Sequence, residues 1–126
     1  MTLAEIIPSI LNALVTGRVY EDATPDNLAR DGSGNILPFI VWSRVGGMDS
    51  EYVDQTMSDK RHARIQILSI APGSIVADQL DESVLQAMLA STYTVGVNGS
   101  PGGTYDAPRK LRGRRRQFSI WFHQSQ

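Results

Sequence analysis

The chain has 126 residues, a formal net charge of −1 and no cysteine. A chain of this length buries roughly two-thirds of its unfolded surface, so it needs neither a disulfide nor a metal to hold a core. The lack of cysteine excludes disulfide frameworks, thiolate metal sites and cysteine nucleophiles. No apolar run approaches the ~20 residues that span a bilayer. We therefore expect one soluble domain over residues 1–126, without membrane contact.

The first predicted element is an amphipathic helix within residues 2–17. Thr2 and Glu5 have the spacing of a capping box, in which the two residues satisfy free N–H groups of the first turn. Pro8 lacks the N–H that a helix interior requires, so we expect either a kink there or a regular helix that begins near Pro8. Apolar residues recur at helical spacing, at Leu3, Ile6, Ile7, Ile10, Leu11 and Leu14.

The next segments predict two strands and two loops. Residues 18–20 suggest a short edge strand, and residues 21–36 are polar and turn-rich, which predicts an extended surface loop. Residues 37–45 are rich in β-branched and aromatic side chains, so they predict a strand that starts after Pro38. Residues 46–60 show no clear period and are expected to form an extended excursion, a projecting hairpin or loop.

A second strand, a helix and a third strand follow. Residues 60–71 are polar at first and apolar later, which predicts a strand that leaves the core and projects outward. Ser74 is a good N-cap for a helix over residues 75–90, and residues 92–98 predict a third strand. One face of the helix is apolar, with Ala77, Leu80, Val84, Ala87 and Met88.

The C-terminal part predicts a loop and a final strand. Residues 98–113 begin with a Gly/Pro-rich stretch and are expected to form an extended loop. Residues 117–123 alternate between apolar and polar side chains, as a half-buried strand does. The order of elements predicts an α+β fold with a mostly antiparallel sheet of about four strands. Two helices are expected to pack on one face of that sheet.

Charge is distributed unevenly along the chain. All thirteen acids lie in residues 1–108 beside six Lys or Arg, a balance of −7, whereas residues 109–126 carry six Lys or Arg and no acid. Such polarity suggests contact between unlike surfaces, either between copies of this chain or with a charged partner.

The six C-terminal cations lie within eight positions and form the main candidate interaction site. They are Arg109, Lys110, Arg112, Arg114, Arg115 and Arg116. Three interpretations stay open: contact with acidic protein, contact with the phosphates of DNA, and simple solvation. The sequence pI of about 6.1 is far from that of a basic DNA-binding domain, and no helix-turn-helix or zinc-finger pattern is present. We favour contact with protein.

Three aromatic residues complete the candidate interface: Trp42, Trp121 and Tyr52. Both tryptophans are out of phase with the apolar neighbours that we assign to the helix side of the sheet, such as Phe39 and Val41. Both indoles are then expected on the opposite face. That face is either buried as well, or an exposed aromatic patch that binds a partner, because Trp is enriched at interaction hot spots.

Catalytic and cofactor patterns are not found in the sequence. There is no G-x-S-x-G elbow, and the two histidines, His62 and His123, do not have the spacing of a metal site. The glycine-rich residues 98–103 lack the Lys-Ser or Lys-Thr of a phosphate-binding loop. We predict a protein that is not an enzyme and that uses no cofactor or metal.

Four segments carry a family resemblance: "LNALVTGRVYEDATP" (11–25), "LPFIVWSRVGG" (37–47), "RIQILSIAP" (64–72) and "RRRQFSIWFHQ" (114–124). In this order and spacing the chain resembles the tail-terminator, or tail-completion, proteins of long-tailed bacteriophages and prophages. These small proteins lie at the joint between head and tail. The resemblance covers most of the chain.

The resemblance implies an α+β protein that forms a six-fold ring on the tail tube, ends tube growth and docks the head-completion proteins. It implies as partners further copies of the chain, the tail tube protein and a head-completion or neck protein, with non-specific contact to the passing genomic DNA. The expected location is the head–tail junction of the virion, and the host cytoplasm during assembly. The family contributes no catalytic residues.

Two alternatives stay open beside the terminator. One is a small DNA-binding accessory protein that uses residues 109–116, and the other is a different neck or tail-tube component of similar fold. Under the terminator hypothesis the basic run meets an acidic protein surface. Reversal of Arg114, Arg115 and Arg116 to Glu is then expected to block assembly while the monomer stays folded.

Overall fold

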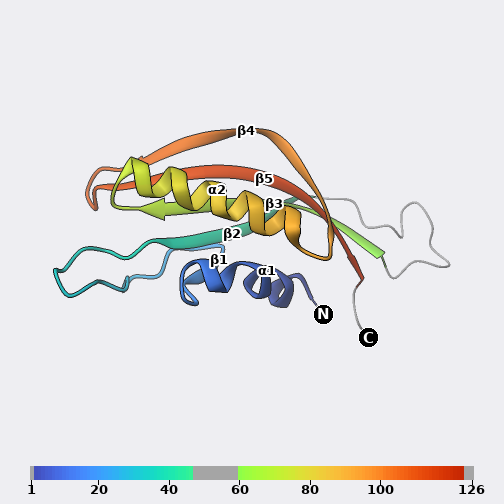
Figure 1. The fold of residues 1–126 in the computed structure, drawn as a ribbon, viewed down its shortest axis with the longest axis horizontal. Coiled ribbons are helices and arrows are strands. Elements are labelled where there is room, and N and C mark those ends of the chain that lie inside the picture. Colours follow the sequence, from blue (N-terminus) through green and yellow to red (C-terminus); the bar gives the residue numbers. More distant parts are fainter. Residues whose placement is uncertain (1, 47–59, 124–126) are drawn as a thin grey trace.

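A computed structural model describes residues 2–46 and 60–123 (Figure 1). Its elements are α1 (Leu3–Leu11), a 3-10 turn η1 (Asn12–Leu14), β1 (Val19–Glu21), β2 (Phe39–Gly46), β3 (Lys60–Ala71), α2 (Ser74–Ala90), β4 (Thr94–Asp106) and β5 (Leu111–His123). The predicted excursion of residues 46–60 and the candidate residue Tyr52 lie outside the described residues, apart from the strand ends Gly46 and Lys60.

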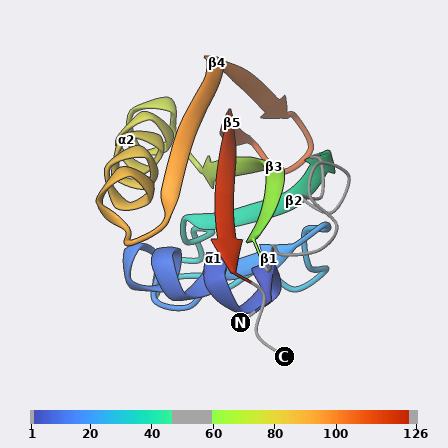
Figure 2. The ribbon, with the colours of Figure 1, turned by 90° about the vertical axis from the view of Figure 1, so that its right-hand side faces the viewer.

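The five strands form one sheet in the order β1-β2-β3-β5-β4. The short β1 pairs with β2 in parallel, and the other neighbours are antiparallel. Both helices lie on the same face of this sheet, with α2 over β3 and β5 (Figures 1 and 2). The predicted α+β class is confirmed, and so is the position of residues 18–20 at a sheet edge.

Helix α1 begins at Leu3 and continues through Pro8, so the alternative of a helix that begins near Pro8 is wrong. Its start is fixed by the predicted capping pair: the backbone N–H and the hydroxyl of Thr2 both donate to Glu5 Oε1, each over 3.0 Å. The backbone hydrogen bond from Thr2, and then the hydroxyl, lower the pKa of Glu5 below its ordinary value of 4.5. Burial of the apolar face favours the helix enough to tolerate the proline.

The principal core lies between the helices and the sheet. Fully buried side chains from both helices meet the facing residues of the four longer strands, and each such burial stabilises the fold by roughly 1.5–3 kcal/mol. The largest of them include Ile6, Ile7, Leu11, Ile40, Ile65, Ile67, Val84, Met88, Phe118 and Ile120.

A second, smaller core lies on the sheet face that carries no helix. The loop between β1 and β2 folds across the start of β2 and brings Leu28 and Ile36 onto the sheet. They contact side chains of β2, β3 and β5, namely Phe39, Val41, Leu68, Ile70 and Leu111. The apolar run of β2 is therefore buried on both faces, and this explains why its residues do not alternate with polar ones.

The predicted loop of residues 98–113 is wrong, because most of it lies in strands. β4 extends to Asp106, β5 begins at Leu111, and residues 107–110 form the tight turn between them. Lys110 occupies the turn with a φ of +57°, a left-handed conformation. β5 pairs with β3 along the whole of β3. This tertiary pairing overrides the weak strand propensity of glycine and of consecutive charges.

Candidate interaction surface of the basic strand

Four of the six predicted cations lie within strand β5, and they point to both faces of the sheet. Arg114 and Arg116 lie on the helix side, as do Phe118 and Ile120 further along the strand. Arg115 points to the opposite face. A Cβ placed on its cross-strand neighbour Gly102 would lie only 3.0 Å from the Arg115 guanidinium. The basic run is therefore not one continuous patch.

Arg116 forms a buried ion pair with Asp81 of α2. Its Nη2 donates to Asp81 Oδ2 over 2.6 Å and its Nε donates to Asp81 Oδ1 over 3.2 Å, the two-pronged geometry that strengthens such pairs. The two side chains are only 12% and 9% exposed. The hydrogen bond to Asp81 raises the pKa of Arg116, although burial opposes this rise. This arginine joins α2 to the sheet.

Arg114 repeats the arrangement one helical turn away. It pairs with Asp78, which precedes Asp81 by three residues and therefore lies on the same side of α2. This pair is closer to solvent, since the side chain of Asp78 is 61% exposed and that of Arg114 is 25% exposed. Together the two pairs align α2 along β5.

The sequence did not identify these aspartates as partners. Asp81 is 94% buried and lies between Leu80 and Val84 in the apolar stripe of α2. A carboxylate within an apolar helix face was a signal for a buried cationic partner, because an unpaired charge is costly to bury. This signal does not specify which arginine pairs with Asp81.

The other cations gather near the β4–β5 turn. Arg109 forms an exposed ion pair of 3.6 Å with Asp106, and the guanidinium of Arg112 lies 4.1 Å from the centre of the Tyr105 ring, a cation–π contact. Within the described residues, no carboxylate pairs with Lys110, Arg112 or Arg115. We call these three cations the basic patch of the hairpin, although Arg112 lies on the helix side of β5 and Arg115 on the opposite face.

Gly113 interrupts the basic run for a steric reason. A Cβ at this position would lie 2.3 Å from Thr104 Oγ1 of the paired strand. The glycine thus permits close pairing of β4 and β5 beside the basic patch.

Trp42 is not on the face that we predicted. It is 2% exposed and packs in the principal core on the helix side, whereas Phe39 and Val41 face the second core. The error follows from burial of β2 on both faces, since its apolar residues do not mark one side. In the monomer Trp42 is a core residue.

Trp121 does lie on the face without helices, as predicted. It is half-buried and stacks on His62, its direct cross-strand neighbour, with ring centres 4.6 Å apart and an interplanar angle of 29°. On the same face, Asn98 Nδ2 donates to Ser119 Oγ over 2.8 Å. The ring is therefore part of an ordered polar surface.

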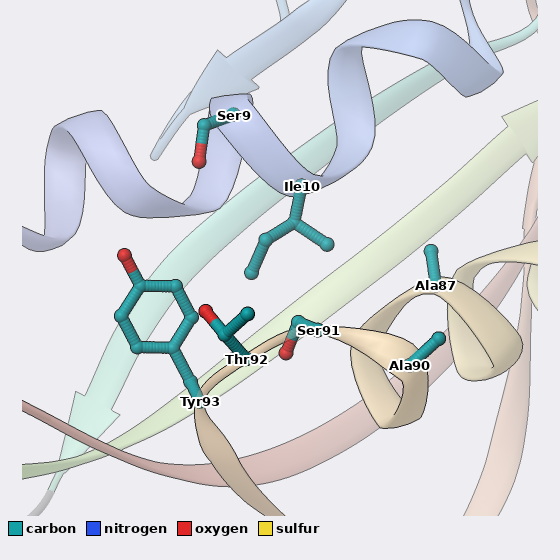
Figure 3. A pocket seen from close by; sticks show the side chains of 7 residues that line it. All are labelled: Ser9, Ile10, Ala87, Ala90, Ser91, Thr92 and Tyr93. Atoms are coloured by element: carbon teal, nitrogen blue, oxygen red, sulfur yellow. The ribbon is translucent and has the colours of Figure 1, made fainter.

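A shallow hollow of about 370 Å³ lies between α1 and the end of α2 (Figure 3). Two of the three serine and threonine hydroxyls that line it are engaged locally: Ser9 donates to the Ile6 carbonyl over 2.6 Å, and Ser91 to the Met88 carbonyl over 2.8 Å. Its remaining lining comprises Ile10, Ala87, Ala90, Thr92 and Tyr93.

Residues 2–46 and 60–123 contain no cluster of three or more His, Cys, Asp or Glu side chains that could hold a metal ion. None of the helices in this part of the chain has both the length and the apolar character needed to cross a bilayer.

Comparison with protein-family models gives no match for this chain, and comparison with the curated proteins gives none either. Among solved structures, a similar fold occurs in a chain of a particle described as "Virion of native gene transfer agent (GTA) particle". The TM-score is 0.58 and the identity is 19%, over 92% of this chain and 86% of that chain. At this identity the likeness shows the fold.

Proposed function

We propose that this protein is a structural component of a phage-type virion, and that it acts as a tail terminator. In this role it caps the tail tube, ends tube growth and provides the docking surface for head-completion proteins. The observation that carries the proposal is the fold likeness to a chain of a gene transfer agent virion across 92% of this sequence. The ordered segments that resemble tail terminators, and that span most of the chain, support the specific role.

The proposed assembly is a ring of six copies at the head–tail junction of the virion, formed in the host cytoplasm. Its partners are the tail tube protein and a head-completion or neck protein, and genomic DNA passes through the ring with non-specific contacts at most. The proposal assigns the protein no catalysis and no cofactor.

The basic hairpin supports a protein contact better than a dedicated DNA-binding site. Arg114 and Arg116 are neutralised by aspartates of α2. The remaining basic patch, Lys110, Arg112 and Arg115, offers half of the cations that the sequence contains in this region. Each lost phosphate contact lowers DNA affinity and flattens its salt dependence.

The reversal variant suggested by the sequence must be changed. Replacing Arg116 with Glu would place two carboxylates together in a buried site and would damage the fold. A suitable variant combines Arg112→Glu with Arg115→Glu, because these side chains are exposed and bind no carboxylate within the described residues. This double variant tests assembly without disturbing the fold of the single copy.

The test is capping of tail tubes purified from particles that lack this protein. We expect the wild-type chain to bind tube ends and fix tube length in electron micrographs, and the Arg112→Glu, Arg115→Glu variant to bind them poorly. Retention on duplex DNA is measured in parallel. Tight DNA retention with a steep salt dependence, together with no binding to tube ends, would favour the DNA-binding accessory protein instead.

A further inference from the structure

The two edges of the sheet differ in how their backbone groups are satisfied. β1 has three residues, and local turns occupy its outer side: the Val19 N–H donates to the Gly17 carbonyl over 2.9 Å, and the Ala23 N–H to the Glu21 carbonyl over 2.8 Å. β4 has thirteen residues, and no described strand lies on its outer side. Among the described strands, β4 has the longest unpaired edge, and β2 has a shorter one beyond Trp42.

β4 has few of the charges that usually protect an edge strand. Natural edges carry lysines or inward-pointing charges that prevent pairing with another chain. The only charged residue of β4 is Asp106, at its end. Val97 and Tyr105 are 40% and 53% exposed along the strand. Two other protective features are present: Pro101, which has no N–H to donate, and a register shift between Asn98 and Gly102. They divide the edge into two halves. The half after the shift is flanked by the basic patch.

An acidic surface lies on the loop after β1. This loop runs over the face without helices, where its Thr24 lines a small hollow together with Thr104 and Asp106 of β4. The loop of residues 22–38, between β1 and β2, follows the exposed Glu21. It carries Asp22, Asp26 and Asp31, which are exposed and form no ion pair within the described ranges. This acidic loop contains one cation, Arg30. In Figures 1 and 2 it belongs to the β1 side of the sheet, while β4 borders the other side.

The acidic loop and the basic turn also lie at the same end of the molecule, at the left of Figure 1. A rotation about an axis roughly parallel to the strands therefore brings the acidic loop of one copy beside the basic patch of the next. Contacts of this head-to-tail kind use two different surfaces of each copy, and they close into a ring when successive rotations return to the first copy. The local turns engage the Val19 N–H and the Glu21 carbonyl of β1, so we take the loop and not β1 as the contact surface.

We propose that the β4 edge and its basic patch bind the acidic loop of a second copy of this chain. This inference rests on the proposed ring and identifies the surfaces that meet within it. The opposite charges select the partner, and the open backbone of β4, with Tyr105 beside it, supplies further hydrogen bonds and apolar contact. The loop and the hairpin thus have a function in each junction of the ring.

The test is a charge exchange between two variants. One combines Arg112→Glu with Arg115→Glu, and the other combines Glu21→Lys with Asp26→Lys. Asp31 is kept because its Oδ1 accepts the N–H groups of Ser33 and Asn35 over 2.8 and 3.0 Å and holds the loop. We expect each variant alone to associate at least ~10-fold more weakly than the wild type. Their equimolar mixture should associate again, because every junction then joins opposite charges.

Association is measured by native mass spectrometry and sedimentation, and occupancy of tube ends by electron microscopy. Arg112→Lys with Arg115→Lys is the matched control, which keeps the charges and should associate as the wild type does. Circular dichroism verifies that all variants fold. The inference is overturned if both reversed variants associate normally, or if their mixture stays dissociated.

The two proposals fail in different ways. Tube capping by the wild type that is insensitive to both reversals would overturn the proposed junction and leave the terminator function intact. Rings that form and obey the charge exchange, but do not bind tube ends, would support the junction and count against the terminator. A wild-type chain that neither associates nor binds tube ends would overturn both.

Discussion

Arginines of one strand have two different roles in this molecule. Arg114 and Arg116 pair with aspartates of α2, whereas Arg112 and Arg115 bind no carboxylate in the described part of the chain. In sequence all four belong to one basic run. The comparison teaches that a run of charges is divided by the helix that lies over it, so that two arginines hold α2 to the sheet while their neighbours have no carboxylate partner among the described residues.

The largest effect is expected at the buried pair. Arg116→Ala leaves Asp81 charged and unpaired in a nearly buried site, which should lower the free energy of unfolding by about 3–5 kcal/mol. Urea denaturation followed by circular dichroism measures the change. The double variant Arg116→Met, Asp81→Leu is the control and should recover most of the loss, because it leaves no buried charge. A loss below about 1 kcal/mol in the single variant would contradict a structural role for this pair.

Arg114→Ala should have a smaller effect on the same measurement. The Arg114–Asp78 pair is partly exposed, with Asp78 open to solvent, so removing it should lower the free energy of unfolding by about 0.5–1 kcal/mol. The loss should shrink in 1 M salt, which screens exposed charges. If Arg114→Ala were as damaging as Arg116→Ala, the distinction between the two pairs would be wrong.

The smallest effect on stability is expected at Arg115. Its side chain is exposed and makes no ion pair among the described residues, so Arg115→Ala should change the free energy of unfolding by no more than about 0.5 kcal/mol. The same substitution should weaken association of the copies. If the Arg115→Ala variant is stable and associates normally, Arg115 does not take part in recognition, and only Arg112 and Lys110 of the basic patch remain for that role.

Much of the fold could be predicted because the sequence contains local signals. The capping pair Thr2 and Glu5, the apolar stripe of α2 and the strand after Pro38 all occur where their patterns indicate. The hairpin of β4 and β5 could not be predicted from local patterns. Its glycines and arginines are weak strand formers, and their extended conformation depends on pairing with β3.

The candidate site was predicted only in part. The basic run indicated an interaction region, but its separation into paired and unpaired arginines depends on the placement of Asp78 and Asp81 beneath it. The side of Trp42 was predicted wrongly, because alternation along a strand assigns a face only when one of the two faces is polar. Trp121, in a strand with regular alternation, was placed on the correct face.

The position of β5 constrains how the chain folds. β5 is the last of the five strands in sequence, yet it lies between β3 and β4. Until β5 has left the ribosome, a nascent chain therefore cannot join β4 to the rest of the sheet. Nor can it hold α2 through Arg114 and Arg116 of β5. Pairing of strands so distant in sequence is slow compared with helix formation. The β4 edge, in the register that β5 gives it, therefore forms only after β5 has paired with β3 and β4.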